Sequence, residues 1–175
     1  TGAEAIRGLL VTGAPGRWSA ETELLLFNAA RRDHLERTIR PALDRGAVVL
    51  CDRYVDSTRA YQGAGAPHLA EAVETLHALM IGRDPDLTLL FDLDPDRAAV
   101  RRAGDPQAGT AGAKDPGTED RFERRGLAFQ HALRARFLAL AAAEPGRFRV
   151  IDAEAEAKTV TERAAAALGH MLSGA

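Results

Sequence analysis

The chain carries, at residues 51–63, the stretch CDRYVDSTRAYQG, which directly follows the apolar run AVVL at residues 47–50. A short apolar run rich in β-branched residues predicts a fully buried strand. A carboxylate, an arginine and several hydroxyls would then emerge at the carboxyl end of that strand, where open α/β sheets bind ligands. Because a guanidinium group matches the geometry of a phosphate, Asp52 and Arg53 indicate phosphate chemistry. The alternative is a buried Asp–Arg pair that only fixes the loop.

The composition indicates a single globular domain over residues 1–175, with 46% hydrophobic and 27% charged residues. A net charge of −2 gives no overall attraction to nucleic acid or to an anionic membrane. No apolar window is long enough to predict a transmembrane helix. The single cysteine, Cys51, excludes an internal disulfide and fits a reducing cytoplasm, so we expect a cytoplasmic protein. At the end of a core strand, Cys51 is expected to be a small buried hydrophobe.

Apolar periodicity and capping residues predict helices that alternate with three buried strands. Strands are expected over residues 47–51, 86–92 and 147–151, and helices over residues 3–11, 19–45, 55–61, 68–81, 95–102, 119–143 and 157–172, with a loop at 63–67. Pro41 should kink or divide the second helix, and Gly46 should end it. This order predicts an α/β fold with a parallel sheet covered by helices on both faces. The glycine-rich residues 103–119 have no apolar periodicity, which is typical of a functional lid or of disorder.

Several other groups of residues are candidates for nucleotide chemistry. Phe27 and Arg31 lie four apart on one helix, so an aromatic ring beside a guanidinium could sandwich and hydrogen-bond a nucleobase. Taken alone, their spacing favours the alternative of a core phenylalanine beside a surface arginine. Arginines flank the glycine-rich segment at 101, 102 and 121, where they are either lid residues that approach phosphate or ordinary solvated charges. Asp152 and Ala153 follow the third strand and again lie at the ligand-binding edge of the sheet.

Taken together, five stretches resemble bacterial thymidylate kinase, in the right order and over nearly the whole chain. They are ETELLLFNAAR (21–31), IRPAL (39–43), DRY with STRAYQG (52–54 and 57–63), PDLTL (85–89) and DRFE (120–123). The family transfers the terminal phosphoryl group of ATP to dTMP, giving dTDP, with magnesium. The resemblance implies a P-loop kinase-like parallel sheet flanked by helices, a lid at about residues 103–119, and a homodimer.

The resemblance also implies a role for particular residues. Phe27 would stack on thymine, and Arg31 would hydrogen-bond its edge. The acceptor phosphate would be held by Arg53, Arg7 and Gln62, and the thymidine pocket would be lined by Ser57, Thr58 and Tyr61. Asp52 would lie near the magnesium ion and the transferring phosphate. Arg101, Arg102 or Arg121 would serve the lid, and Asp152 with Ala153 would lie on the ATP side.

The sequence departs from the family at its beginning. The family starts with a strand, a Walker A loop, a helix and a second strand, and this sequence shows none of them. We hypothesise that the working protein carries such a segment, whose first strand would lie between residues 47–51 and 87–92. A structure that pairs those two strands directly would contradict this hypothesis. The alternatives are a nucleotide-binding relative without catalysis and a kinase for dUMP or another pyrimidine monophosphate.

Overall fold

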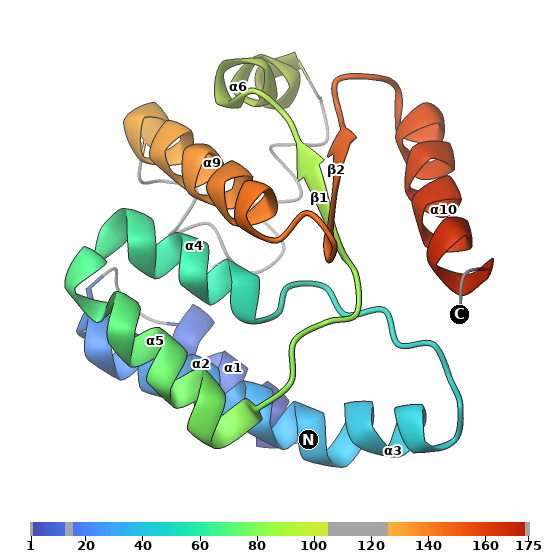
Figure 1. The fold of residues 1–175 in the computed structure, drawn as a ribbon. Helices are drawn as coiled ribbons and strands as arrows, with labels where there is room; N and C mark the ends of the chain where they lie inside the picture. The colour runs from blue at the N-terminus through green and yellow to red at the C-terminus, as the bar shows by residue number, and fades with distance from the viewer. Residues whose placement is uncertain (1, 13–15, 105–125, 174–175) are drawn as a thin grey trace.

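The computed structural model describes residues 2–12, 16–104 and 126–173. Helices surround a small sheet, and the N-terminal helices form a layer on one side of it (Figure 1). The elements up to the first strand are α1 (Gly2–Val11), α2 (Ala20–His34), η1 (Leu35–Ile39), α3 (Arg40–Asp44), α4 (Val55–Gly65), η2 (Pro67–Leu69), α5 (Ala70–Leu76) and η3 (His77–Ile81). They are followed by β1 (Thr88–Asp92), α6 (Pro95–Gly104), α9 (Gly126–Ala143), β2 (Phe148–Asp152) and α10 (Ala157–Ser173).

The sheet consists of β1 and β2, which are parallel and in register from Thr88 opposite Phe148 to Asp92 opposite Asp152. Helices α9 and α10 lie on opposite sides of it (Figure 1), and both contact β2. The α/β class, the second and third expected strands and their parallel direction are therefore confirmed. Parallel neighbours also place the chain after β1 and the chain after β2 at the same edge.

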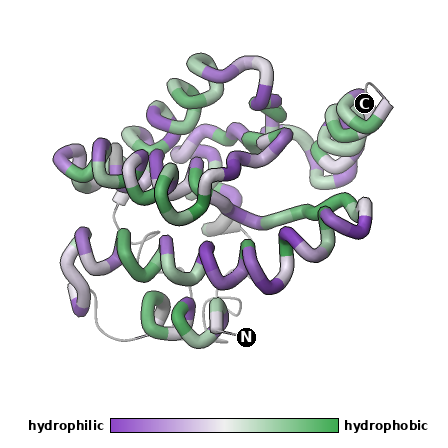
Figure 2. Tube along the Cα trace, turned by 60° about the horizontal axis from the view of Figure 1, so that its bottom comes forward, coloured by the Kyte–Doolittle hydropathy of each residue, from purple (hydrophilic) through white to green (hydrophobic). Residues whose placement is uncertain are grey.

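The strand expected at residues 47–51 is wrong. This run is extended but not part of the sheet, and Figure 2 shows it in green between α3 and α4. Val48 is 57% exposed and Leu50 is 79% exposed. The expectation that Cys51 is buried is wrong as well, because Cys51 is exposed. A strand needs a neighbour for its backbone groups, and among the described residues β1 pairs with β2 and not with this run. The hypothesis of a longer protein is thus not contradicted and stays a prediction.

The long second helix is divided just before Pro41, as expected. It begins at the predicted cap, where Ser19 Oγ accepts a hydrogen bond from the Thr22 amide at 3.2 Å. Because Pro41 has no N–H and its ring crowds the preceding turn, the regular α-helical bonding cannot pass through it. The turn Leu35–Ile39 is π-helical instead, and α3 continues from Arg40. The left-handed Gly46, at φ 76°, follows the helix end.

The remaining helices are confirmed, with some changes of boundary. Helix α4 runs on to Gly65, so residues 63–65 are helical rather than a loop. The helix expected over residues 68–81 is resolved into η2, α5 and η3. The apolar faces of these N-terminal helices form two buried clusters, one of Leu24, Ala66, Leu69 and Val73 and one of Leu35, Ile39 and Ile81. The first cluster packs α2 against η2 and α5, and the second packs η1 against η3.

The expected lid falls almost entirely on residues that lie outside the described part of the chain. Ala103 and Gly104 belong to the end of α6, whereas residues 105–119, and residues 119–125 of the helix expected there, are not described. The start of α6 is capped, since the Asp96 amide donates to Asp94 Oδ1 at 3.0 Å. Among the helices that the structure describes, none combines the length and the apolar character needed to cross a membrane.

Candidate active site

Arg31 joins α2 to the beginning of α4. Its Nη2 atom donates to Thr58 Oγ1 at 2.6 Å and to the Tyr54 carbonyl at 3.4 Å. Its guanidinium carbon lies 5.5 Å from the centre of the Tyr54 ring. The Nη1 atom is buried and has no hydrogen-bond partner among the described residues. Burial lowers the pKa of the Arg31 guanidinium, which stays positively charged at neutral pH. The arrangement leaves one charged donor of Arg31 buried and without a partner among the described residues.

Arg53 lies in a left-handed backbone conformation, with φ 63°. Such a conformation is uncommon for a residue with a side chain, and it is often found at functional sites. Its Nη1 atom donates to the Tyr61 hydroxyl at 2.9 Å, and its guanidinium carbon is 5.6 Å from the Tyr61 ring centre. The backbone thus directs an exposed arginine onto α4. This brings together two residues that the sequence assigned to one site.

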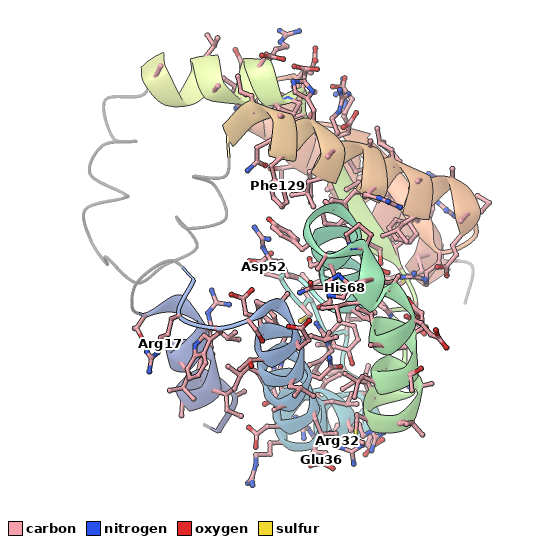
Figure 3. The ribbon with its side chains drawn as sticks, turned by 90° about the vertical axis from the view of Figure 1, so that its left-hand side faces the viewer. Arg17, Arg32, Glu36, Asp52, His68 and Phe129 are labelled. Carbon is pink, nitrogen blue, oxygen red and sulfur yellow. The ribbon has the colours of Figure 1, made fainter. Side chains whose placement is uncertain are left out.

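Tyr61 is itself held by two aromatic rings from α9. The Phe129 ring is tilted at 6.2 Å, and the Phe137 ring meets it edge-on at 6.4 Å. Figure 3 shows Phe129 below α9 and Asp52 in the space between α9 and α2. The floor of the candidate site is therefore α4, with α2 and α9 on either side.

The other residues expected at the acceptor site are distributed around this floor. Ser57 is half-buried in the first turn of α4, and Gln62 is buried one turn further along. Phe27 is half-buried on α2, one turn before Arg31. Arg7 is exposed on α1, which packs against α2. Their roles stay predictions.

A second group lies at the carboxyl end of the sheet. Arg101 Nη1 donates to the Ala153 carbonyl at 3.1 Å, and the Ala153 amide donates to the Asp92 carbonyl at 2.9 Å. Asp152 accepts from the Glu154 amide and from Arg163, and these contacts lower the pKa of its carboxyl. The structure thus brings Arg101 to the predicted nucleotide edge. Arg102 lies in α6, and Arg121 lies outside the described residues.

Asp52, expected near magnesium, is exposed and forms no ion pair with the residues that the structure describes. A free carboxylate fits a magnesium ion, which binds oxygen ligands and keeps several waters. Within the described residues, the one cluster with metal-ligating spacing is instead Asp94, Asp96 and His131. Arg134 forms ion pairs with Asp94 at 3.0 Å and with Asp92 at 2.7 Å. Its guanidinium therefore already neutralises part of the negative charge of this cluster.

Four residues of the site were not identified from the sequence. Tyr54 contacts Arg31, Phe129 contacts Tyr61, and Asp56 on α4 binds Arg147 just before β2. Tyr54 and Asp56 lie within residues 51–63, so their position in the sequence was a local signal for both. Phe129 and Arg147 are far away in the chain, and no local pattern connects them to α4.

Comparison with known proteins identifies one family. The sequence model of the thymidylate kinase family matches residues 1–164. The thymidylate kinase of Ruegeria pomeroyi is 54% identical over 159 residues, covering 91% of this chain and 71% of that protein. The Jannaschia relative is 51% identical over 174 residues, covering 99% of this chain and 79% of that one.

A solved thymidylate kinase structure, from Ehrlichia chaffeensis, superposes with a TM-score of 0.61 at 29% identity. The superposition covers 85% of this chain and 66% of that structure. The match to the family model spans the motifs at residues 21–31 and 52–63. The chain belongs to the thymidylate kinase family.

Proposed function

We propose that the protein, at its full natural length, transfers the terminal phosphoryl group of ATP to dTMP, and that α2 and α4 hold the acceptor nucleotide. The observation that carries this proposal is the Arg31 guanidinium, which is fixed by Thr58 and keeps one buried donor unpartnered. A buried donor without a partner is costly. A carbonyl oxygen on the edge of thymine would satisfy it when the side chains that cover Nη1 move aside on nucleotide binding.

The residue types suit the chemistry. The acceptor phosphate is already an oxyanion, so the reaction needs no strong general base. The difficulty is to bring two polyanions together and to stabilise the charge on the transferring group. In this proposal Arg53 binds the acceptor phosphate, Phe27 stacks on the base, and Ser57, Tyr61, Gln62 and Arg7 complete the pocket.

Magnesium, when bound, would neutralise charge on the transferring phosphate. Asp52 is the residue of this chain that we assign to it, because its carboxylate is exposed beside Arg53. Asp152, Ala153 and Arg101 would lie on the ATP side, with Arg102 and Arg121 as further arginines around the lid. We also infer a cytoplasmic location and a homodimer, in keeping with the single cysteine and the family resemblance.

The proposal is tested by measuring ADP formation from ATP and magnesium in the protein at its natural length. The acceptors to compare are dTMP, dUMP and none. Turnover that depends on dTMP supports the proposal, and turnover with dUMP alone would reassign the substrate. Binding of dTMP without any turnover would indicate a nucleotide-binding relative without catalysis.

A further inference from the structure

Asp56 is a buried carboxylate in the first turn of α4, next to Ser57 and Thr58. It is 4% exposed. Its Oδ1 atom accepts from Arg59 at 3.0 Å and from Arg147 at 2.9 Å, and its Oδ2 atom accepts from Thr88 at 2.9 Å and from Arg147 at 2.7 Å. Both oxygens are therefore saturated by charged or hydroxyl donors.

Arg147 hydrogen-bonds this carboxylate through both terminal nitrogens, in the bidentate geometry that binds a carboxylate most strongly. Its side chain is also nearly buried, and it donates to Thr88 Oγ1 at 3.0 Å and to both oxygens of Glu144. The backbone of Arg147 is fixed as well, because its carbonyl accepts the Thr88 amide at 2.8 Å. Asp56 is thus bound to the point where β1 and β2 begin, 91 residues further along the chain.

The second arginine on Asp56 extends the network to α5. Arg59 donates to both oxygens of Glu74, at 2.9 Å each, and to Asp84 at 2.8 Å. Burial opposes ionisation of the Asp56 carboxyl, but the bonds from Arg147, Thr88 and Arg59 hold its pKa below the usual range. The carboxylate is therefore charged at neutral pH, and its loss would leave the two guanidinium groups with buried, unpaired donors.

We propose that Asp56 and Arg147 are positioning residues for the acceptor-nucleotide site, acting by fixing the first turn of α4 to the sheet. This inference rests on the proposed function. Thr58 lies two residues from Asp56, and its Oγ1 atom meets Arg31 Nη2 at 2.6 Å. A hydrogen bond of that length tolerates little displacement. When the Asp56–Arg147 bond is lost, the first turn shifts, and Arg31 and Thr58 no longer present one rigid surface to the base.

The test compares Arg147→Met with Arg149→Met in the protein at its natural length. Arg149 is a matched control because it lies on β2 two residues after Arg147, is exposed, and donates within the described residues to the carbonyls of Pro145, Gly146 and Phe148. Initial rates are measured well below the unfolding temperature, with dTMP and ATP varied separately. We expect Arg147→Met to raise the KM for dTMP by tenfold up to about 100-fold, since small misplacements carry costs of that order. The KM for ATP should stay within about twofold, and the control should match the wild type.

Asp56→Asn tests the same positioning role from the carboxylate side of the bond. It keeps the size of the side chain but weakens both arginine contacts, so it should produce the same selective rise in the KM for dTMP. Arg147→Lys, which keeps the charge but cannot form the fork, serves in its place if Arg147→Met does not fold. A lower melting temperature with an unchanged KM for dTMP in these variants would overturn the inference and leave a purely structural bond. Failure of the wild type to phosphorylate dTMP would instead overturn the proposed function, so the two failures are distinguishable.

Discussion

Arg31 Nη2 and Thr58 Oγ1 lie 2.6 Å apart, and this hydrogen bond joins helices α2 and α4 across 27 residues of sequence. Thr58 is 6% exposed, so the bond is shielded from water. The Tyr54 ring lies alongside the same guanidinium at 5.5 Å. The orientation of Arg31 is therefore set by two residues of the stretch at 51–63, before any nucleotide binds.

Thr58→Val should weaken binding of the acceptor nucleotide without unfolding the protein. Valine has nearly the shape of threonine but cannot accept the bond from Arg31, which leaves a second guanidinium nitrogen without its firm partner. We expect the KM for dTMP to rise about tenfold, which corresponds to a charged hydrogen bond of about 1.4 kcal/mol. Thr58→Ser, which keeps the hydroxyl, is the control. A wild-type KM in the valine variant would contradict the role assigned to this contact.

Two substitutions at Arg53 distinguish the backbone strain at this position from the role of its guanidinium in phosphate binding. Arg53→Ala removes the guanidinium but keeps a Cβ at φ 63°, whereas Arg53→Gly also removes the steric cost of that conformation. Both variants should lose about 100-fold or more in kcat/KM for dTMP. The glycine variant should be more stable than the alanine variant by about 1 kcal/mol in urea unfolding. Near-normal turnover in either variant would refute the assignment of Arg53 to the acceptor phosphate.

Acid should destabilise the protein partly through Asp56. The pKa of this carboxyl is depressed in the folded state below the value of about 3.9 expected in an unfolded chain. The unfolded state therefore binds more protons in this range. The stabilisation is fully present above about pH 5 and is lost as the pH falls through the folded-state pKa.

The measurement for this prediction is urea unfolding at a series of values between about pH 6 and pH 3. Asp56→Asn should lower stability at pH 6, and its stability should fall less steeply towards acid than that of the wild type. Asp44→Asn, which removes an exposed carboxylate from the end of α3, controls for the change in net charge. Equal slopes for the wild type and Asp56→Asn would show that this carboxyl does not contribute to the acid sensitivity.

Arg101→Ala should affect ATP rather than dTMP. The Arg101 guanidinium donates a hydrogen bond to the Ala153 carbonyl, just past the carboxyl end of β2 and away from the Arg31–Thr58 contact. We expect the KM for ATP to rise about three- to tenfold while the KM for dTMP is unchanged. Arg97→Ala is a suitable control, because Arg97 lies one turn earlier on α6 and pairs with Glu154. An effect confined to dTMP would place Arg101 on the acceptor side instead.

Local sequence was a good guide to the helices. Capping at Ser19, the proline at 41 and the glycine at 46 each act over a few residues, and the structure has the corresponding helix start, π-helical turn and left-handed helix end at those places. The existence and parallel direction of β1 and β2 were also predictable, because both are short apolar runs joined by helical segments, but the sequence did not predict that they are neighbours. By contrast, the run at residues 47–51 has the composition of a core strand and is not one. Composition describes what a segment can do, whereas hydrogen bonding in a sheet depends on a neighbour elsewhere in the chain.

The sequence by itself determined the family, most of the helices, the two strands that pair, and the stretch around Asp52 and Arg53 to which we assign phosphate binding. Those features are local, since they depend on periodicity, caps and residue types within short windows. Only the tertiary structure decided that Arg31 meets Thr58, that Phe129 supports Tyr61, and that Arg147 holds Asp56. Contacts between residues tens of positions apart depend on how helices pack around the sheet. That packing is set by the burial of many apolar side chains at once, which no short window of sequence contains.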